Sequence, residues 1–111
     1  MIYELREYDI EPGKLAAYDK RFEEVDIVSL FEKHGMKVIG FWHTVIGENA
    51  QNRVTYMLAY EDLGARERAW KSFHADPTWP QKRRETETDG RPWNRHIRNS
   101  ILAPTSYSPL K

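Results

Sequence analysis

The stretch that decides the predicted fold is KVIGFWHTVIGENAQNRVTYMLAY, residues 37–60. Two runs rich in β-branched and aromatic residues, 37–46 and 53–60, flank the segment 47–52, whose glycine and asparagines are typical of a turn. The pattern predicts a β-hairpin. Apolar side chains occupy both alternating sets of positions in its strands, whereas a sheet with one face in water is apolar at only one set.

Working outward from the hairpin, the sequence predicts one more strand at each end and a helix after the first and third strands. The elements are a strand over 2–10, an amphipathic helix from 14 to the stop at 35, the hairpin, a helix that begins after 62 and is interrupted at 76–77, a short helical extension past 80, a strand over 93–103 and an extended tail over 104–111. This βαββαβ order is that of a ferredoxin-like α+β domain, in which one antiparallel sheet carries both helices on one face. The length predicts a single domain over residues 1–111.

The second apolar face of the hairpin needs a cover that helices on the opposite side cannot give. A second copy of the chain is the simplest cover, so we expect a homodimer in which two sheets meet. About 500 Å² of apolar surface per subunit, at about 25 cal/mol per Å², would contribute on the order of 12 kcal/mol before the costs of association. The alternative is a monomer in which the C-terminal tail covers this face.

Composition excludes several classes of function. Seventeen basic and seventeen acidic residues cancel, so we expect neither nucleic acid nor membrane as a partner. Cysteine is absent, which excludes disulfides, thiolate metal sites and cysteine nucleophiles. No secretory leader or membrane-length apolar stretch is present, so a cytoplasmic protein is expected. Without a phosphate-binding loop, a metal-type histidine pair or a nucleophile elbow, we expect no metal and no cofactor.

Polar side chains on the first strand are the first candidates for chemistry. Tyr3 and Leu5 suit the helical side of the sheet, which predicts that Glu4, Arg6 and Tyr8 point into the lumen between two paired sheets. A carboxylate and a guanidinium in such a cavity could orient an anionic or phenolic ligand. The alternative is a structural ion pair that joins the dimer.

The hairpin supplies a candidate base and an aromatic set. His43 lies mid-strand and could act as a general base, although a lone histidine among apolar neighbours is more often a hydrogen-bonded core residue. Trp42, Tyr56 and Tyr60 could stack on a flat substrate, or pack within the sheet. The predicted catalytic residues are therefore Glu4, Arg6 and His43, and the predicted ligand-binding residues are Tyr8, Trp42, Tyr56 and Tyr60.

Several short segments are spread along nearly the whole chain: YELREY at 3–8 with PGK at 12–14, GFW at 40–42, IG at 46–47, LAYEDL at 58–63 with Arg66, ADPTW at 75–79, ILAP at 101–104 and SPL at 108–110. In this order they resemble the signature stretches of the NIPSNAP family. Leu58 departs from the family pattern, where many members carry Trp, and this would reshape a pocket there. The resemblance implies a ferredoxin-like unit that pairs into a dimeric α/β barrel. The wider group of such barrels includes cofactor-independent monooxygenases, small isomerases and haem enzymes, an analogy of fold alone.

Two classes of function stay open at this point. In the first, the dimer encloses a small apolar or aromatic molecule and alters it without a bound cofactor, as a cofactor-independent monooxygenase or an isomerase. In the second, the chain is a non-catalytic dimerising module that engages a partner or senses a ligand. The sequence does not decide whether the protein is an enzyme.

Overall fold

Four strands and four helices make up the chain, and the computed structural model describes all 111 residues. In chain order they are β1 (Ile2–Ile10), α1 (Leu15–Glu24), α2 (Ile27–Lys33), β2 (Lys37–His43), β3 (Arg53–Tyr60), α3 (Leu63–Ala75), α4 (Thr78–Thr86) and β4 (Asn94–Leu102). This is the predicted βαββαβ order with each helical region divided in two, so the ferredoxin-like α+β fold is confirmed. None of the four helices has both the length and the apolar character that a membrane-crossing helix requires.

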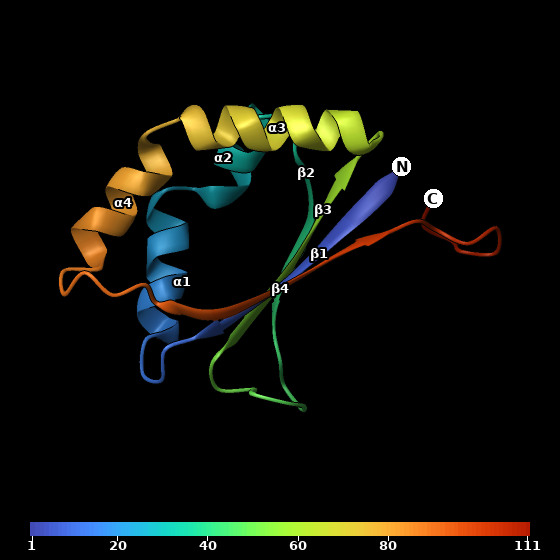
Figure 1. Ribbon diagram of the computed structural model, residues 1–111. Helices are drawn as coiled ribbons and strands as arrows, with labels where there is room; N and C mark the ends of the chain where they lie inside the picture. Colours follow the sequence, from blue (N-terminus) through green and yellow to red (C-terminus); the bar gives the residue numbers. More distant parts are fainter.

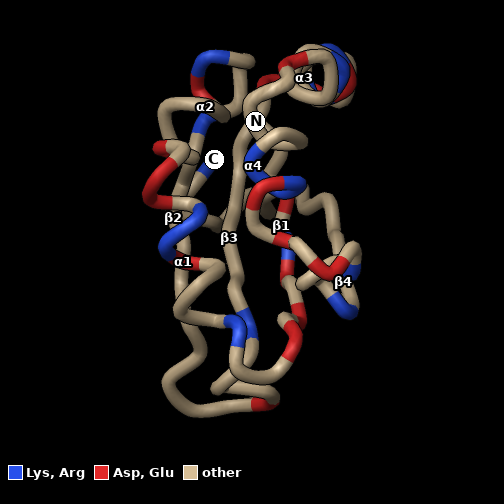
Figure 2. The backbone as a smooth tube through the Cα atoms, turned by 90° about the vertical axis from the view of Figure 1, so that its left-hand side faces the viewer, with Lys and Arg blue, Asp and Glu red and all other residues tan.

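The strands form one antiparallel sheet in the order β2-β3-β1-β4, which runs from left to right in Figure 2. β1 pairs with both β3 and β4 and therefore lies inside the sheet, next to strands from both halves of the chain. The helices lie on one side of the sheet and leave the other side uncovered (Figure 1). The sheet thus has a helix-covered face and an open face.

The expectation that Glu4, Arg6 and Tyr8 face away from the helices is wrong. Their partners across the β1–β3 ladder, all in the core beneath the helices, are Leu58, Tyr56 and Val54. Glu4 also accepts a hydrogen bond from Trp70 of α3, which places it on the helix-covered face. Burial there is possible because the polar groups of these residues bond to one another and to α3, so no charge is left unpaired.

The open face carries the other set of side chains and is apolar over part of its area. Its apolar members are Tyr3, Leu5, Trp42, Met57, Ala59 and Leu102. Trp42 is 49% exposed and Leu102 41% exposed, while Arg53 and Arg98 form ion pairs with Asp9 at the other end of this face. The hairpin is therefore apolar on both faces, as predicted, and a single chain leaves part of one face uncovered.

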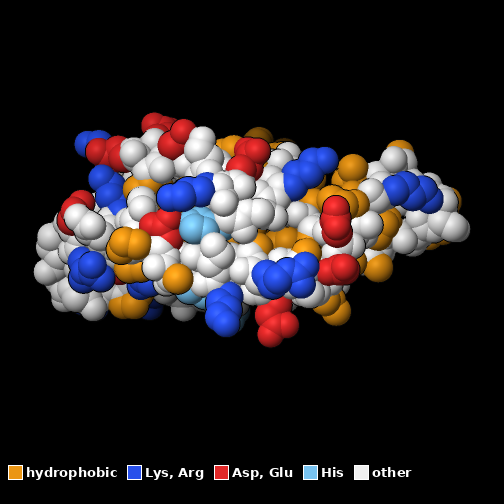
Figure 3. Space-filling view, turned by 90° about the horizontal axis from the view of Figure 1, so that it is seen from above, with side chains coloured by type: hydrophobic (Ala, Val, Ile, Leu, Met, Phe, Trp, Pro, Cys, Tyr) orange, Lys and Arg blue, Asp and Glu red, His pale blue; other side chains and the backbone are white.

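The C-terminal tail reaches only one end of this apolar area, where Tyr3 is buried, while Trp42 and Leu102 stay partly exposed. Residues 103–111 form neither helix nor strand and hook back beyond the end of the sheet, where the Tyr3 hydroxyl donates to the Lys111 carbonyl at 2.8 Å (Figure 1). Tyr107 of the tail is 85% exposed. The view from above looks onto the α3 side, where hydrophobic side chains lie among charged groups (Figure 3). The tail therefore covers the Tyr3 end of the open face and leaves the rest of its apolar area exposed.

Two predicted elements end earlier than expected. The single helix predicted up to residue 35 breaks at Asp26, whose left-handed backbone (φ 49°) turns the chain and whose side chain accepts from Ser29 to begin α2. The turn lets Ile27 and Phe31 pack into the core. The second strand, predicted to reach residue 46, ends at His43, because the chain leaves the sheet edge there and Ile46 is 93% exposed.

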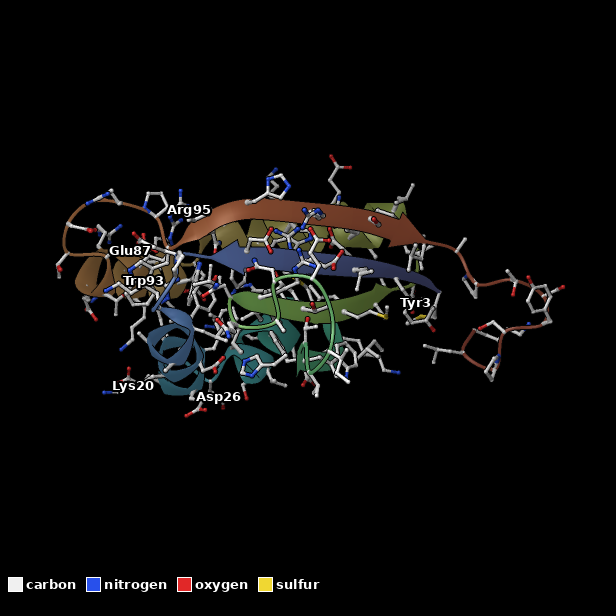
Figure 4. All side chains as sticks on the ribbon, turned by 90° about the horizontal axis from the view of Figure 1, so that it is seen from below. Tyr3, Lys20, Asp26, Glu87, Trp93 and Arg95 are labelled. Atoms are coloured by element: carbon white, nitrogen blue, oxygen red, sulfur yellow. The ribbon has the colours of Figure 1, made fainter.

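A buried arginine holds α1, α4 and the start of β4 together. Arg21 is 1% exposed, and its guanidinium lies 4.3 to 4.7 Å from the ring centres of Tyr18, Trp79 and Trp93. It also donates to Glu87 at 2.8 Å, and Figure 4 shows Glu87 and Trp93 next to each other where the chain returns to the sheet. Stacked aromatic rings and one carboxylate therefore compensate for the burial of this charge.

We predict that Arg21→Met lowers the free energy of unfolding by about 3 kcal/mol, because it leaves the Glu87 carboxylate without its buried partner. Urea denaturation of the two proteins measures the difference. Lys20→Met, an exposed position on the same helix, is the matched control and should change the stability little. Equal midpoints for Arg21→Met and the parent protein would contradict this account.

Candidate functional site

A cavity of about 270 Å³ lies between the helix-covered face of the sheet and the helices. Every helix and three of the strands contribute to its lining, which consists of Arg6, Tyr8, Tyr18, Phe22, Phe31, Tyr56, Trp70, Phe73, His74, Trp79, Pro80, Arg83, Asn94 and Ile97. Most of these side chains are aromatic or apolar, with a few polar groups among them. Such a composition is typical of sites that bind small organic molecules.

Arg6 of β1 is the central polar group of the cavity. Its Nε donates to the Tyr56 hydroxyl at 2.8 Å and to the Tyr8 hydroxyl at 3.2 Å, and its guanidinium lies 4.8 Å from the ring centre of Trp70. Burial disfavours the charged form, but Tyr56, Tyr8 and Glu4 outweigh burial and raise the pKa of Arg6 above its usual value. The cavity therefore has a permanent positive charge held in a fixed orientation.

Glu4 lies behind Arg6 and is fully buried. Its carboxylate accepts hydrogen bonds from Tyr60 at 2.7 Å, Trp70 at 2.8 Å, Arg66 at 2.7 Å and Arg6 at 3.4 Å. Burial alone would raise the pKa of Glu4, but the hydrogen bonds, from Arg66 above all, outweigh it and lower the pKa to about 2. Glu4 is therefore ionised at neutral pH, and it does not line the cavity.

The charges around the cavity favour an anionic ligand. Arg6 and Arg83 are the charged residues of its lining, and no carboxylate is among them. Burial raises the pKa of Tyr56 well above its ordinary value, so this hydroxyl stays neutral and can donate a hydrogen bond. The Tyr8 and Tyr56 hydroxyls share a hydrogen bond that uses one of their two protons, so an anion that enters the cavity meets two guanidinium groups and one phenolic donor.

The structure separates the sequence-predicted site residues into two groups. Arg6, Tyr8 and Tyr56 meet at the cavity, with Glu4 and Tyr60 bonded to each other directly behind Arg6. His43 and Trp42 line a different, open cleft of about 550 Å³ at the β2 edge. His43 Nε2 lies 2.9 Å from the carboxylate of Asp19 in this cleft. The residues that line the cleft are Asp19, Phe22, Glu23, Asp26, Ile27, Val28, Phe41, Trp42, His43 and Val54. His43 and Arg6 therefore belong to different sites. Leu58, the departure from the family pattern, is fully buried and lines neither.

Sequence reasoning missed the cavity residues that the helices supply. Tyr18 belongs to the periodic stripe of the first helix, and a stripe does not distinguish a core residue from a cavity wall. Trp70 and Trp79 also lie on helices and face the sheet, and the sequence does not show that they line a cavity. His74 lies in the last turn of α3, at the cavity.

The comparison with known proteins identifies the family. The architecture is a ferredoxin-like α+β sheet with an aromatic cavity under its helices. The chain matches the NIPSNAP family over residues 3–109 and belongs to that family. None of the curated proteins matches the chain.

Solved structures of similar proteins support both the family and the fold. A NIPSNAP family protein from Agrobacterium tumefaciens is 29% identical and superposes with a TM-score of 0.83, covering 99% of this chain and 98% of its own. A NIPSNAP-like domain protein from Burkholderia xenovorans is 30% identical, with a TM-score of 0.81 and coverage of 97% and 88%. A protein from Nitrosomonas europaea, provisionally described as an antibiotic biosynthesis monooxygenase, is 11% identical, with a TM-score of 0.63 and coverage of 94% and 98%. At that identity the last comparison shows a shared fold alone.

We predict that Glu4→Gln lowers the free energy of unfolding at pH 7 by about 3 kcal/mol, because the Arg66 and Arg6 guanidinium groups lose the buried carboxylate that pairs them. The pKa of Glu4 falls from 4.5 in the unfolded chain to about 2 in the fold, so its contribution is complete above pH 4.5 and is lost as the pH falls toward 2. Urea denaturation between pH 7 and pH 2 measures both effects.

The difference in stability between the parent protein and Glu4→Gln should therefore shrink as the pH falls from 4.5 to about 2. Glu61→Gln, an exposed position at the end of β3, is the control and should leave the pH dependence unchanged. A difference that stays constant over this range would show that the Glu4 carboxylate is not the stabilising group.

Proposed function

We propose that this NIPSNAP protein binds a single-ring aromatic molecule with an anionic oxygen in the cavity between its sheet and its helices. The supporting observation is the lining itself, which combines aromatic walls, two guanidinium groups and no carboxylate. A neutral apolar ligand would make no use of Arg6, and a cationic ligand would be repelled by it. An anionic oxygen next to Arg6 satisfies both the charge and the aromatic character of the cavity.

The volume limits the size of the ligand. A cavity of about 150 Å³ is sufficient to hold benzene. The cavity here is about 270 Å³, which suits one substituted ring better than a polycyclic phenol. Trp70 and Phe31 lie on one side of the cavity, with ring centres 5.9 Å apart, and supply edges and faces against which such a ring can pack.

Each polar residue has a distinct role in this proposal. Arg6 contacts the anionic oxygen, while Tyr8 and Tyr56 fix the guanidinium and together offer one phenolic donor beside it. Glu4 is a positioning residue, since it touches Arg6 and not the cavity. Tyr60 in turn holds Glu4. His43 and Trp42 lie in the other cleft and remain unassigned in this proposal.

We extend the proposal to chemistry without a bound cofactor, of the isomerase or monooxygenase kind. Both begin when a proton leaves the substrate and negative charge develops on an oxygen, and a fixed guanidinium in a partly dry cavity stabilises such charge. His74 lines the same cavity, and its imidazole is a candidate general base for a bound ring. Arg6 and His74 would then stabilise the anion and accept the proton, respectively.

We predict that Arg6→Met weakens the binding of benzoate about tenfold or more and leaves the binding of neutral benzyl alcohol unchanged, because only the anion uses the guanidinium. Isothermal titration calorimetry measures both. Arg6→Lys keeps the charge but loses the planar contacts to Tyr8 and Tyr56, and it should bind benzoate with intermediate affinity.

Arg68→Met removes an exposed guanidinium from α3 and serves as the control, with benzoate affinity as in the parent protein. Thermal denaturation verifies that each variant is folded. If the folded parent protein binds neither compound, or if Arg6→Met binds benzoate as tightly as the parent does, the proposed site is wrong. The non-catalytic interaction module would then be the better description.

We also propose that two copies of the chain pair through their open faces. Trp42 and Leu102 are partly exposed on this face, and Val45 and Ile46 next to it are 90% and 93% exposed, which is unusual for large apolar side chains unless they meet a partner. The family resemblance points to the same dimeric α/β barrel. The cavity lies on the opposite face of each sheet, so each subunit would keep its own site.

Trp42→Glu is predicted to shift the protein from dimer to monomer at micromolar concentration, because it places a charge on the apolar part of the open face. Light scattering during size-exclusion chromatography measures the mass. Leu63→Glu, at an exposed apolar position at the start of α3, is the control and should stay dimeric. A monomeric parent protein at this concentration would refute the pairing.

A further inference from the structure

A serine, a histidine and an aspartate form a hydrogen-bonded chain where the end of α2 meets the last turn of α3. The Oγ of Ser72 lies 2.6 Å from Nδ1 of His34, and Nε2 of His34 lies 2.8 Å from Oδ2 of Asp76. None of the three lines the cavity that holds Arg6 or the cleft at the β2 edge. The cluster is therefore separate from the site described above.

Asp76 fixes which nitrogen of His34 carries the proton. Its Oδ1 accepts from the Thr78 hydroxyl at 2.6 Å and from the Thr78 backbone N–H at 2.9 Å, and these bonds hold the pKa of Asp76 well below its usual range. An ionised carboxylate can only accept a hydrogen bond, so Nε2 of His34 must carry a proton. In the neutral imidazole Nδ1 is then the acceptor, and the Ser72 hydroxyl donates to it.

The base of this chain is sheltered, whereas the hydroxyl is accessible. The His34 side chain is 9% exposed, and its ring lies edge-on to Phe73 with the ring centres 6.0 Å apart. Ser72 is exposed to solvent. A serine bonded to a base that a third group orients is the arrangement that activates serine nucleophiles on unrelated folds. The geometry therefore gives Ser72 the partners that a nucleophile requires.

The position of Ser72 limits the substrates that it can use. It lies in the last turn of α3, where the backbone N–H groups are bonded within the helix. Water must then solvate the oxyanion of a tetrahedral intermediate, and water stabilises it less than fixed donors do. Reaction therefore requires an ester with a good leaving group. Because Ser72 lies outside both the cavity and the cleft, a small acyl group suits it best.

We propose that Ser72 accepts acyl groups from small activated esters, with His34 as its general base and Asp76 as a positioning residue. The Ser72 oxygen attacks the ester carbonyl while its proton passes to Nδ1 of His34. The leaving alcohol takes this proton from His34, and the acyl group stays on Ser72. Water then attacks the acyl-serine with help from the same nitrogen, which releases a carboxylic acid and restores the serine. This activity does not depend on ligand binding in the cavity.

A fluorophosphonate probe tests the nucleophile, because it reacts with activated serines and forms a stable adduct. We expect peptide mass spectrometry to locate the adduct on Ser72. Trypsin cleaves after Lys71 only when this lysine is unmodified, so a modified tryptic peptide that begins at Ser72 distinguishes the serine from its neighbour. Ser29 is the matched serine within the same chain, since it is exposed and donates to Asp26 at 2.8 Å but contacts no histidine. It should stay unmodified.

Three variants assign the roles, with the release of nitrophenol from p-nitrophenyl acetate as the measure of rate. Ser72→Ala and His34→Gln remove the nucleophile and the base, and each should lower the rate about tenfold or more. In Asp76→Asn, the atom that faces His34 Nε2 becomes an amide nitrogen, which donates and moves the imidazole proton to Nδ1. This variant should therefore lose the activity as well, while Oδ1 still accepts from Thr78.

The tautomer of His34 is a readout that a merely structural role for Asp76 would not move. Heteronuclear NMR of the ring nitrogens should show the proton on Nε2 in the parent protein and on Nδ1 in Asp76→Asn. Ser29→Ala is the control for the kinetics and should react as the parent protein does. Thermal denaturation verifies that each variant is folded.

The outcomes are decisive in both directions. If the probe modifies no serine, or modifies Ser29 as readily as Ser72, the proposal is overturned and the cluster is a tie between α2 and α3. Equal rates of nitrophenol release for the parent protein and folded Ser72→Ala would overturn it too. Modification of Ser72 that is lost in folded His34→Gln and Asp76→Asn supports the proposal.

Discussion

The buried carboxylate of Glu4 is the constraint on which the rest of the structure depends. A charge without exposure must be compensated in full, because an unpaired buried carboxylate costs several kcal/mol. Its partners come from three elements: Arg6 on β1, Tyr60 on β3, and Arg66 with Trp70 on α3. The same set of bonds therefore fixes α3 across the sheet and orients the guanidinium of Arg6. The cavity lies on the side of the Arg6 guanidinium that faces away from Glu4. Its shape depends on the position of α3 and on the orientation of Arg6, and the Glu4 hydrogen bonds fix both.

The cavity under the helices and the cleft at the β2 edge differ more in the charge of their linings than in shape. The inner cavity is lined by Arg6 and Arg83 without a carboxylate, whereas the cleft at the β2 edge has Asp19, Glu23 and Asp26 without a lysine or arginine. The two share the ring of Phe22 and are otherwise built from different side chains. A net charge of zero for the whole chain thus conceals two local environments of opposite sign. The selectivity of each is a property of its lining and not of the fold.

The fold was largely predictable, and the reason lies in local pattern. The alternation in the hairpin and the three-to-four-residue stripe of the first helix depend on the regular geometry of strands and helices, so short stretches of chain contain the information. The exceptions are local as well: the left-handed Asp26 divides α1 from α2, and no periodic pattern signals such a turn. Three of the 14 residues that line the cavity were found in the same way. Arg6, Tyr8 and Tyr56 were selected as polar or aromatic residues on strands, and they do meet.

The sequence by itself determined the βαββαβ order, the two-sided apolar hairpin and the polar residues of β1. Only the tertiary structure decided which face those residues occupy, because alternation defines two sets of side chains and does not say which set the helices cover. The decision depends on partners far along the chain, since Arg66 and Trp70 lie more than sixty residues from Glu4 and supply the donors that make its burial possible. The separation of His43 from Arg6 has the same origin. Positions on different strands become one site or two only when the helices have packed over the sheet.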